Sequence, residues 1–241
     1  MRWSPSRRFF LWLFLWLFNG QPLGLRVLHE AVKLSADGYI FKRQGWPITT
    51  PLGLIMMTDV TRFPDWRAAV QALPPGSAVI LRDYDHTARA ALAREMADFC
   101  RAHHMRFLVA GDAALATRLG VGFHCPSYLL ARHPQLATPA TLNRQGLIAT
   151  AAVHNFRDMV CAARMGFRQV ILSPAFATTS HPGAPSLGPV RFLALARAGH
   201  QIGLTVFALG GMNEKKWARL AGGHDVLAGL AAISFFQSLK G

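Results

Sequence analysis

The sequence predicts an α/β protein of the (β/α)8 TIM-barrel class, preceded by an extra hydrophobic and basic N-terminal segment. From Leu52 onward, short apolar runs typical of strands alternate with stretches that carry apolar residues at helical spacing, and eight such runs are found. This alternation predicts a parallel sheet, and eight units favour a closed barrel over an open one. The chain of 241 residues has the usual length for one such domain.

The expected strands are rich in Val, Ile, Leu and Ala, as strands buried on both faces of a sheet usually are. They cover Leu52–Thr58, Ala78–Arg82, Arg106–Ala110, Val121–His124, Leu147–Val153, Val170–Phe176, Leu204–Leu209 and Val226–Ile233. Helices are expected between them at Asp65–Leu73, His86–His104, Ala113–Leu119, Phe156–Met165, Pro189–Ala198 and Glu214–Leu220, with a looser segment from Tyr128 to Arg144. Asn213 is expected to cap the last of these helices.

Residues 1–51 are expected to form an N-terminal extension, and residues 52–241 the barrel. The apolar run from Phe9 to Phe18 is too short to cross a bilayer of roughly 30 Å as a helix. It resembles a secretory signal, but no A-x-A-like cleavage site follows it. The remaining alternatives are a helix lying on the barrel and a weak membrane association of residues 1–20.

Composition limits the choice of compartment and partner. Hydrophobic residues make up 51% of the chain and charged residues 16%, which allows a large core. The net charge of +14 attracts phosphates, nucleic acids or anionic membranes alike. The arginines show no aromatic interleaving, so nucleic-acid binding is not expected. The three cysteines form no CxxC and leave an odd one out, which indicates a reducing, cytoplasmic compartment.

A single site is expected at one end of the barrel, because the loops that follow the strands of this fold gather there. The polar groups directly after the strands are Arg82-Asp83, Gly111-Asp112, His124-Cys125, His154, Thr178–His181, Gly210-Gly211 and Ser234. Small hydroxyl residues and glycines offer hydrogen-bond donors without bulk, as a phosphate-bearing ligand requires. Phosphorylated small molecules are therefore the expected partners.

Three segments of the chain resemble one known family. They are Ser-Pro-Ala-Phe-Ala-Thr-Thr-Ser-His-Pro-Gly at 173–183, Ala-Leu-Gly-Gly-Met at 208–212 and Ala-Ala-Ile-Ser at 231–234. In order and spacing they are similar to thiamine phosphate synthase and its relative, the TenI-type thiazole tautomerase. The resemblance covers roughly Leu52 to Phe236 and implies the same barrel.

The resemblance implies a thiamine-biosynthetic transferase that joins a pyrimidine methyl diphosphate to a thiazole phosphate and releases pyrophosphate with Mg²⁺. The implied thiazole-phosphate residues are Thr178, Thr179, Ser180, Gly211, Ile233 and Ser234. Arg82 and His181 fall on diphosphate-binding positions, and Asp112 on a Mg²⁺ ligand.

The chain departs from the family pattern on the diphosphate side. Tyr84 and Gly111 replace a lysine and an asparagine, and the second acidic ligand, expected near Leu129, is absent. These departures predict weaker binding of Mg²⁺ and of the diphosphate, because Mg²⁺ usually relies on one or two carboxylates. The alternative to a synthase is therefore the tautomerase, which needs only a proton shuttle beside a bound thiazole phosphate.

The tautomerase alternative depends on His154, because Ala-Val-His154 is similar to the tautomerase's Ser-Val-His segment. The imidazole is either an acid–base catalyst or a cap of the next helix. Asp112 likewise either holds Mg²⁺ or caps the helix that starts at Ala113. A barrel that binds ligand without catalysis is the third alternative, and a homo-oligomer is left open.

Overall fold

The computed structural model describes residues 53–62, 64–132, 138–178, 183, 185–220 and 225–233. Its strands are β1 (Leu54–Met57), β2 (Ala78–Leu81), β3 (Arg106–Ala110), β4 (Gly122–Cys125), β5 (Ala149–Val153), β6 (Gln169–Leu172), β7 (Thr205–Leu209) and β8 (Leu227–Ala232). Its helices are α4 (Trp66–Gln71), α5 (Arg89–Ala102), α6 (Ala113–Leu119), α7 (Ser127–Arg132), α8 (Thr138–Arg144), α9 (Phe156–Arg164), α10 (Gly188–Gln201) and α11 (Glu214–Ala218).

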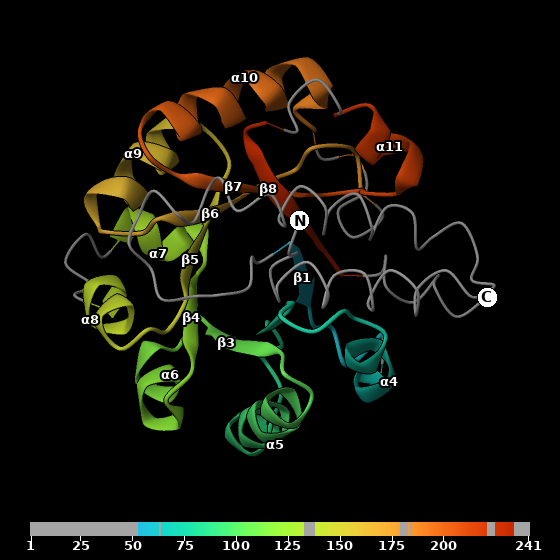
Figure 1. Cartoon of the computed structure of the whole chain (residues 1–241), viewed down its shortest axis with the longest axis vertical. Coiled ribbons are helices and arrows are strands. Elements are labelled where there is room, and N and C mark those ends of the chain that lie inside the picture. The colour runs from blue at the N-terminus through green and yellow to red at the C-terminus, as the bar shows by residue number, and fades with distance from the viewer. Residues whose placement is uncertain are drawn as a thin grey trace, which may run out of the picture.

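The strands close into a barrel in which each pairs in parallel with its neighbour in the sequence, and β8 returns to β1. Figure 1 shows the helices on the outside of this ring. The predicted (β/α)8 fold is therefore confirmed. Residues 1–52, with the extension and the apolar run expected there, lie outside the described residues. Within the described part of the chain, no helix is long and apolar enough to span a membrane.

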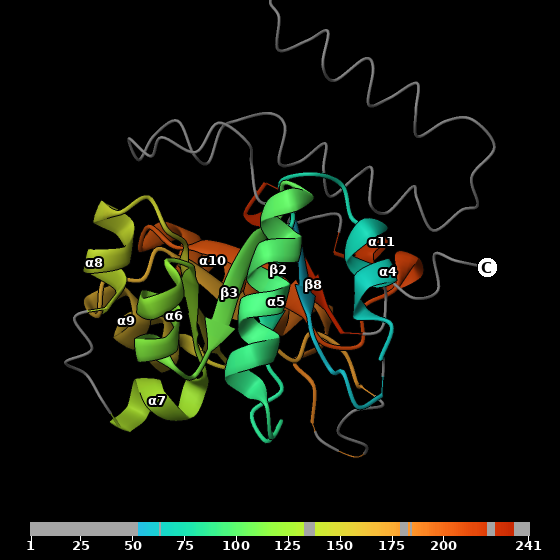
Figure 2. The same ribbon diagram turned by 90° about the horizontal axis from the view of Figure 1, so that it is seen from below.

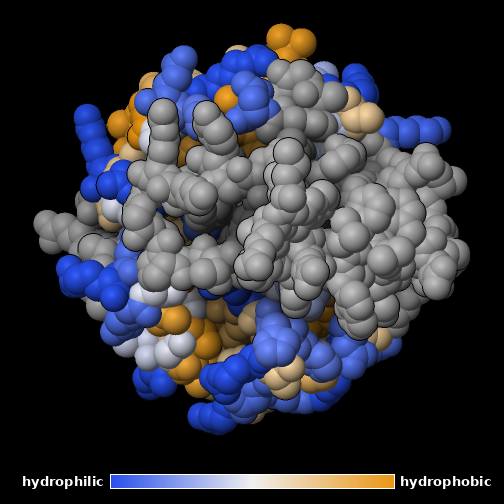
Figure 3. All heavy atoms as spheres, in the orientation of Figure 1, coloured by the Kyte–Doolittle hydropathy of each residue, from blue (hydrophilic) through white to orange (hydrophobic). Residues whose placement is uncertain are grey.

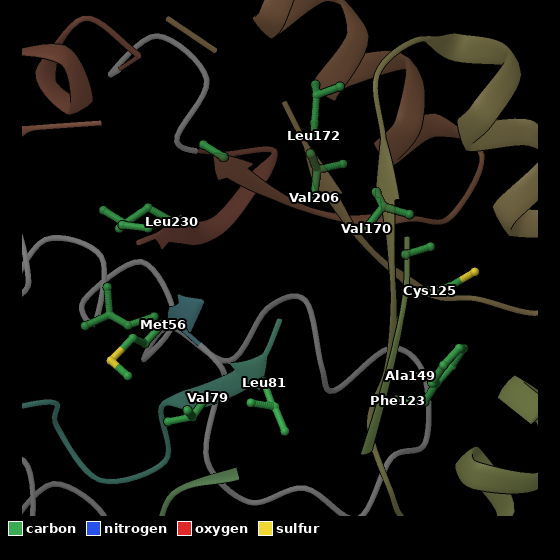
Figure 4. Close-up of a cluster of buried hydrophobic side chains, with 14 of the residues drawn as sticks. Met56, Val79, Leu81, Phe123, Cys125, Ala149, Val170, Leu172, Val206 and Leu230 are labelled. Atoms are coloured by element: carbon green, nitrogen blue, oxygen red, sulfur yellow. The ribbon is translucent and has the colours of Figure 1, made fainter. Parts of the chain in front are cut away.

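Successive side chains of each strand point to opposite faces of the sheet, and this divides the core into two clusters. Side chains that point outward pack against the helices, and Figure 4 shows several of them around the ring, among them Met56, Val79, Phe123 and Val206. Those that point inward, such as Ile55, Ile80 and Phe207, fill the barrel. Figure 3 shows one end of the barrel, where the described surface is largely hydrophilic with smaller hydrophobic patches.

Capping side chains fix the starts of several helices. Asp65, Asp112, Asn155 and Asn213 each accept a hydrogen bond from a backbone N–H in the first turn of α4, α6, α9 and α11. The predicted cap at Asn213 is confirmed. The cap of α9 is Asn155, so the interpretation of His154 as that cap is wrong.

Two elements differ from the sequence prediction. The segment from Tyr128 to Arg144 holds two helices, α7 and α8, where one loose helix was expected. Strand β6 ends at Leu172, whereas the sequence pattern predicted a strand to Phe176. Pro174 follows the strand and has no N–H to donate to a neighbouring strand. Beyond it, the Ala175 N–H donates to the Leu209 carbonyl at 2.8 Å, which turns the chain across the end of β7.

Candidate active site

A pocket of about 470 Å³ lies at the carboxyl ends of the strands. Its walls come from the loops that follow six strands, including β4, β5 and β6 on one side and β7 and β8 on another. Figure 2 shows α7, which begins just after β4, at the lower end of the barrel. This is the end at which barrels of this class carry their ligands.

Of the residues with an expected catalytic or ligand-binding role, five line this pocket: Arg82, His154, Thr178, Gly211 and Ile233. They are far apart in the sequence, and the parallel strands bring them to one mouth. Asp112 is not among the described residues that line the pocket. The other residues with an expected binding role, Thr179, Ser180, His181 and Ser234, lie outside the described part of the chain.

The imidazole of His154 is held through both ring nitrogens. Its Nδ1 lies 2.8 Å from the Ser173 carbonyl oxygen, and its Nε2 lies 3.1 Å from the hydroxyl oxygen of Ser127. The backbone N–H of His154 donates to Asp158 Oδ2 at 2.9 Å, which fixes the chain at the end of β5. A carbonyl oxygen can only accept, so Nδ1 carries a hydrogen and the neutral ring presents an unprotonated Nε2. An imidazole with one fixed N–H and one accepting nitrogen at a pocket wall can act as an acid–base group.

The glycines after β7 let two loops approach closely. A Cβ on Gly210 would lie 2.8 Å from Pro174 Cα, and one on Gly211 would lie 2.2 Å from the Ala177 carbonyl oxygen. Both glycines have positive φ, at 108° and 59°, a region that side chains disfavour. The backbone of the expected phosphate loop is therefore brought to the pocket wall, as phosphate binding by N–H groups requires.

Positive charge is provided beside this loop. The Lys216 ammonium donates to the Gly211 carbonyl at 2.9 Å and lies 5.6 Å from the centre of the Phe176 ring. The Arg219 guanidinium lies 5.4 Å from the same ring, and Phe176 itself lines the pocket. Two cations thus flank the wall at which a phosphate is expected.

Arg82 approaches the pocket from the end of β2. Its Nη2 lies 3.6 Å from Asp59 Oδ2, a separation that leaves the guanidinium only loosely engaged. Burial raises the pKa of the Asp59 carboxyl, but hydrogen bonds and charge from Arg62, together with the charge of Arg82, outweigh burial and lower it. The carboxylate therefore stays ionised beside Arg82 and partly offsets its charge.

The described residues around Asp112 do not fit a Mg²⁺ site. Asp112 Oδ1 accepts the Leu115 N–H at 2.8 Å, so this carboxylate caps α6. The nearby Asp83 accepts from the Thr58 hydroxyl and, at 2.7 Å, from the Val60 N–H. Among the described residues, no group of three or more His, Cys, Asp or Glu side chains gathers as a metal site. The metal role of Asp112 stays a prediction that its contacts do not support.

An aromatic cluster occupies the β2–β3 side of the mouth. A Cβ on Gly111 would lie 3.0 Å from Tyr84 Cε1 and 3.3 Å from the Tyr128 hydroxyl, so the two rings pack on this glycine. Burial, followed by the proximity of Tyr128, raises the pKa of Tyr84 to about 12, so the phenol is neutral. Arg89 lies beneath it and donates to the carbonyls of Asp83, Leu81 and Ala110. A neutral ring therefore stands where the family pattern has a lysine.

His124 is a second imidazole that lines the pocket, but its chemistry differs from that of His154. It is 2% exposed, and its Nδ1 lies 2.8 Å from the Thr150 hydroxyl. Burial, assisted by the charge of Arg82, lowers the pKa of His124 to about 3. The neighbouring Cys125 is buried, and burial raises the pKa of its thiol to about 12. Both residues therefore stay neutral.

Several residues of the site were not found from the sequence. Ser127, Ser173, Tyr84 and Lys216 all contact the pocket residues, yet the sequence assigned none of them a role in the site, although Ser173 opens the motif at 173–183. Ser127 and Ser173 do follow the ends of β4 and β6. Position after a strand was therefore a signal that could have identified both, and the only one for Ser127.

Comparison with known families gives a specific match. Residues 54–236 match the model of the family described as thiamine monophosphate synthase. A curated thiamine-phosphate synthase of Thioalkalivibrio sulfidiphilus is 28% identical over 180 residues, which span 72% of this chain and 82% of that protein.

Solved structures share the fold at lower sequence identity. A thiamine phosphate pyrophosphorylase from Pyrococcus furiosus superposes with a TM-score of 0.55 at 16% identity, covering 78% of this chain and 96% of the other. An HpcH/HpaI aldolase from Desulfitobacterium hafniense gives a TM-score of 0.52 at 16% identity, covering 78% and 89%. Such neighbours include different enzymes, so they support the barrel and not a reaction.

Proposed function

Because the chain belongs to the thiamine monophosphate synthase family, we propose that it is a thiamine-biosynthetic enzyme whose barrel mouth binds a thiazole phosphate. Thr178, Gly211 and Ile233 line one pocket and come from the loops after β6, β7 and β8. The loops after the last two strands form the phosphate site in many barrels of this class. Thr179, Ser180 and Ser234 would complete the site.

The reaction that the geometry supports best is proton transfer within the bound thiazole, an isomerisation. The observation that carries it is the fixed imidazole of His154, which lines the pocket with Nδ1 on the Ser173 carbonyl and Nε2 on the Ser127 hydroxyl. Nε2 would accept a proton from one atom of the ring, and the resulting imidazolium would return it to another. No second substrate and no metal enter this step, and the electron pair left by the proton stays on the thiazole.

Coupling to a pyrimidine methyl diphosphate is the second candidate, and the name of the Thioalkalivibrio relative favours it. In that reaction Arg82 and His181 would bind the diphosphate, and Arg82 does line the pocket. Against it stand the neutral Tyr84 ring and the capping role of Asp112. A barrel that retains binding without catalysis is the remaining alternative.

One set of measurements on the full chain separates these alternatives. Calorimetry should show that thiazole phosphate binds more tightly than its unphosphorylated alcohol, and equal affinity would overturn the phosphate site. NMR measures isomerisation as the exchange of a thiazole proton with solvent deuterium. A parallel reaction contains the pyrimidine diphosphate and Mg²⁺. Coupling without exchange would identify a synthase, and binding without either reaction would identify a non-catalytic barrel.

The three cysteines support the cytoplasmic location expected from the sequence. All three are free thiols, and Cys100 and Cys125 are buried. Burial also raises the pKa of Cys100 to about 12, which keeps this thiol unreactive.

A further inference from the structure

Ser127, the first residue of α7, is in hydrogen-bond contact with the nitrogen of His154 that faces the pocket. Its hydroxyl oxygen lies 3.1 Å from His154 Nε2. We propose that Ser127 is a proton relay that carries the proton between the bound ligand and His154. The proposal rests on the isomerisation proposed above and adds a second residue to its chemistry.

The tautomer of His154 decides the direction of this hydrogen bond. The Ser173 carbonyl, 2.8 Å from Nδ1, can only accept, so Nδ1 keeps its hydrogen in both protonation states of the ring. In the neutral ring, Nε2 is therefore an acceptor, and the hydroxyl of Ser127 must donate to it. When the ring is protonated, Nε2–H becomes the donor, and the same hydroxyl oxygen accepts.

A hydroxyl suits both states because it carries one hydrogen and two lone pairs. In the forward step, the Ser127 hydrogen moves to Nε2 while the hydroxyl oxygen takes a proton from the thiazole. Serine thus ends as a neutral hydroxyl, the imidazole becomes an imidazolium, and the electron pair stays on the ligand. The return of the proton to another ring atom reverses these moves. No oxidant, metal or additional reactant is needed.

The fold places the three groups in a row along the mouth. Ser127 follows β4, His154 follows β5 and Ser173 follows β6, and these strands pair in that order. All three residues line the same pocket. Ser127 is partly exposed, so its hydroxyl can meet both the imidazole and a ligand. Because the Nε2 lone pair is directed at Ser127 in the resting protein, a ligand proton reaches it most directly through this hydroxyl.

The test compares the full chain with Ser127→Ala, with Ser127→Thr, and with Thr117→Ala as the control. Thr117 is an exposed hydroxyl on α6 that bonds within its own helix, so its loss should leave the exchange rate unchanged. Ser127→Ala should slow thiazole proton exchange by roughly 10- to 100-fold, less than the 10²- to 10⁴-fold typical of losing the acid–base group itself. Thiazole phosphate affinity should change little. Threonine keeps the hydroxyl and should restore most of the rate.

A proton inventory on the unmodified protein gives an independent readout. Rates measured in mixtures of H₂O and D₂O should fall along a curve, because two hydrogens move together in a relay. A straight line for the wild-type protein, or a Ser127→Ala rate equal to wild type, would overturn the relay while isomerisation stands. A wild-type protein that binds thiazole phosphate without exchanging its proton would overturn the isomerisation itself. The two failures are therefore distinguishable.

Discussion

The Nδ1 of His154 lies 2.8 Å from the carbonyl oxygen of Ser173, and this contact gives the imidazole a defined tautomer. The two residues follow neighbouring parallel strands, β5 and β6, whose register pairs Val153 with Leu172. The contact with the carbonyl therefore follows from the strand pairing, and the Ser173 hydroxyl lies farther from the same nitrogen, at 3.3 Å. A main-chain acceptor cannot be removed by substitution of Ser173, so the test of the arrangement must act on His154.

His154→Gln should leave the affinity for thiazole phosphate within a few-fold of wild type, because the phosphate loops follow other strands. It should lower thiazole proton exchange by roughly 10²- to 10⁴-fold, since glutamine cannot accept and return a proton. Calorimetry and NMR exchange measure the two effects separately. His200→Gln, at an exposed position of α10, is the control. Wild-type exchange in the His154 variant would show that this histidine is not catalytic.

Asp112→Asn should change little in either stability or activity, because asparagine is as good an N-cap as aspartate. Asp112→Ala removes the acceptor of the Leu115 N–H and should cost about 1 kcal/mol in the free energy of unfolding. Urea unfolding measures this cost, with Asp65→Asn and Asp65→Ala at the start of α4 as the matched pair. A Mg²⁺-dependent gain in melting temperature that Asp112→Asn abolishes would instead restore the metal role.

The barrel was predictable from the sequence because the spacing of apolar residues differs clearly between its strands and its helices. The predicted end of β6 was wrong because two local signals disagreed there, the apolar pattern and a proline. The apolar residues of Ala175-Phe176 continue the pattern of β6, but the proline before them ends the ladder, and their N–H groups bond to the end of β7. Such a contact depends on a strand more than thirty residues away in the chain. A pattern read over a short stretch of sequence cannot include both partners.

The site was predictable only in part, for a related reason. Arg82, His154 and Gly211 were found because each lies within two residues of the end of a regular strand. Ser127 was missed because serine at the start of a helix has an ordinary structural explanation. What distinguishes it is its distance to His154, from another strand end, and that distance comes from the closure of the barrel.

Gly211→Ala should weaken thiazole phosphate binding by steric displacement of the loop. Its φ of 59° disfavours a side chain, and the new Cβ would meet the Ala177 carbonyl oxygen. Gly120→Ala is a matched control, because its φ is 63° and a Cβ there has nothing within 4 Å. Both variants carry the same backbone strain of roughly 1–2 kcal/mol. Only Gly211→Ala should lose affinity by calorimetry, and equal losses would refute the close approach of the two loops.

The buried His124 should make the protein sensitive to mild acid. Its pKa of about 3 in the folded protein lies below the value of about 6.5 in the unfolded chain. As the pH falls below about 6.5, His124 is protonated in the unfolded chain but stays neutral in the folded protein. The free energy of unfolding therefore decreases. One such group contributes a slope of at most about 1.4 kcal/mol per pH unit, which continues down to about pH 3.

The informative range is from pH 6.5 to about pH 5, above the pH at which most carboxylates titrate. Urea unfolding at several pH values in this range gives the slope for the wild type, for His124→Asn and for His200→Asn. His124→Asn should flatten the slope, whatever its own stability, because no buried imidazole remains to be protonated on unfolding. The exposed His200 should leave the slope as in the wild type. A slope that His124→Asn does not change would mean that His124 accepts its proton in the folded barrel, and the neutral role assigned to it would be wrong.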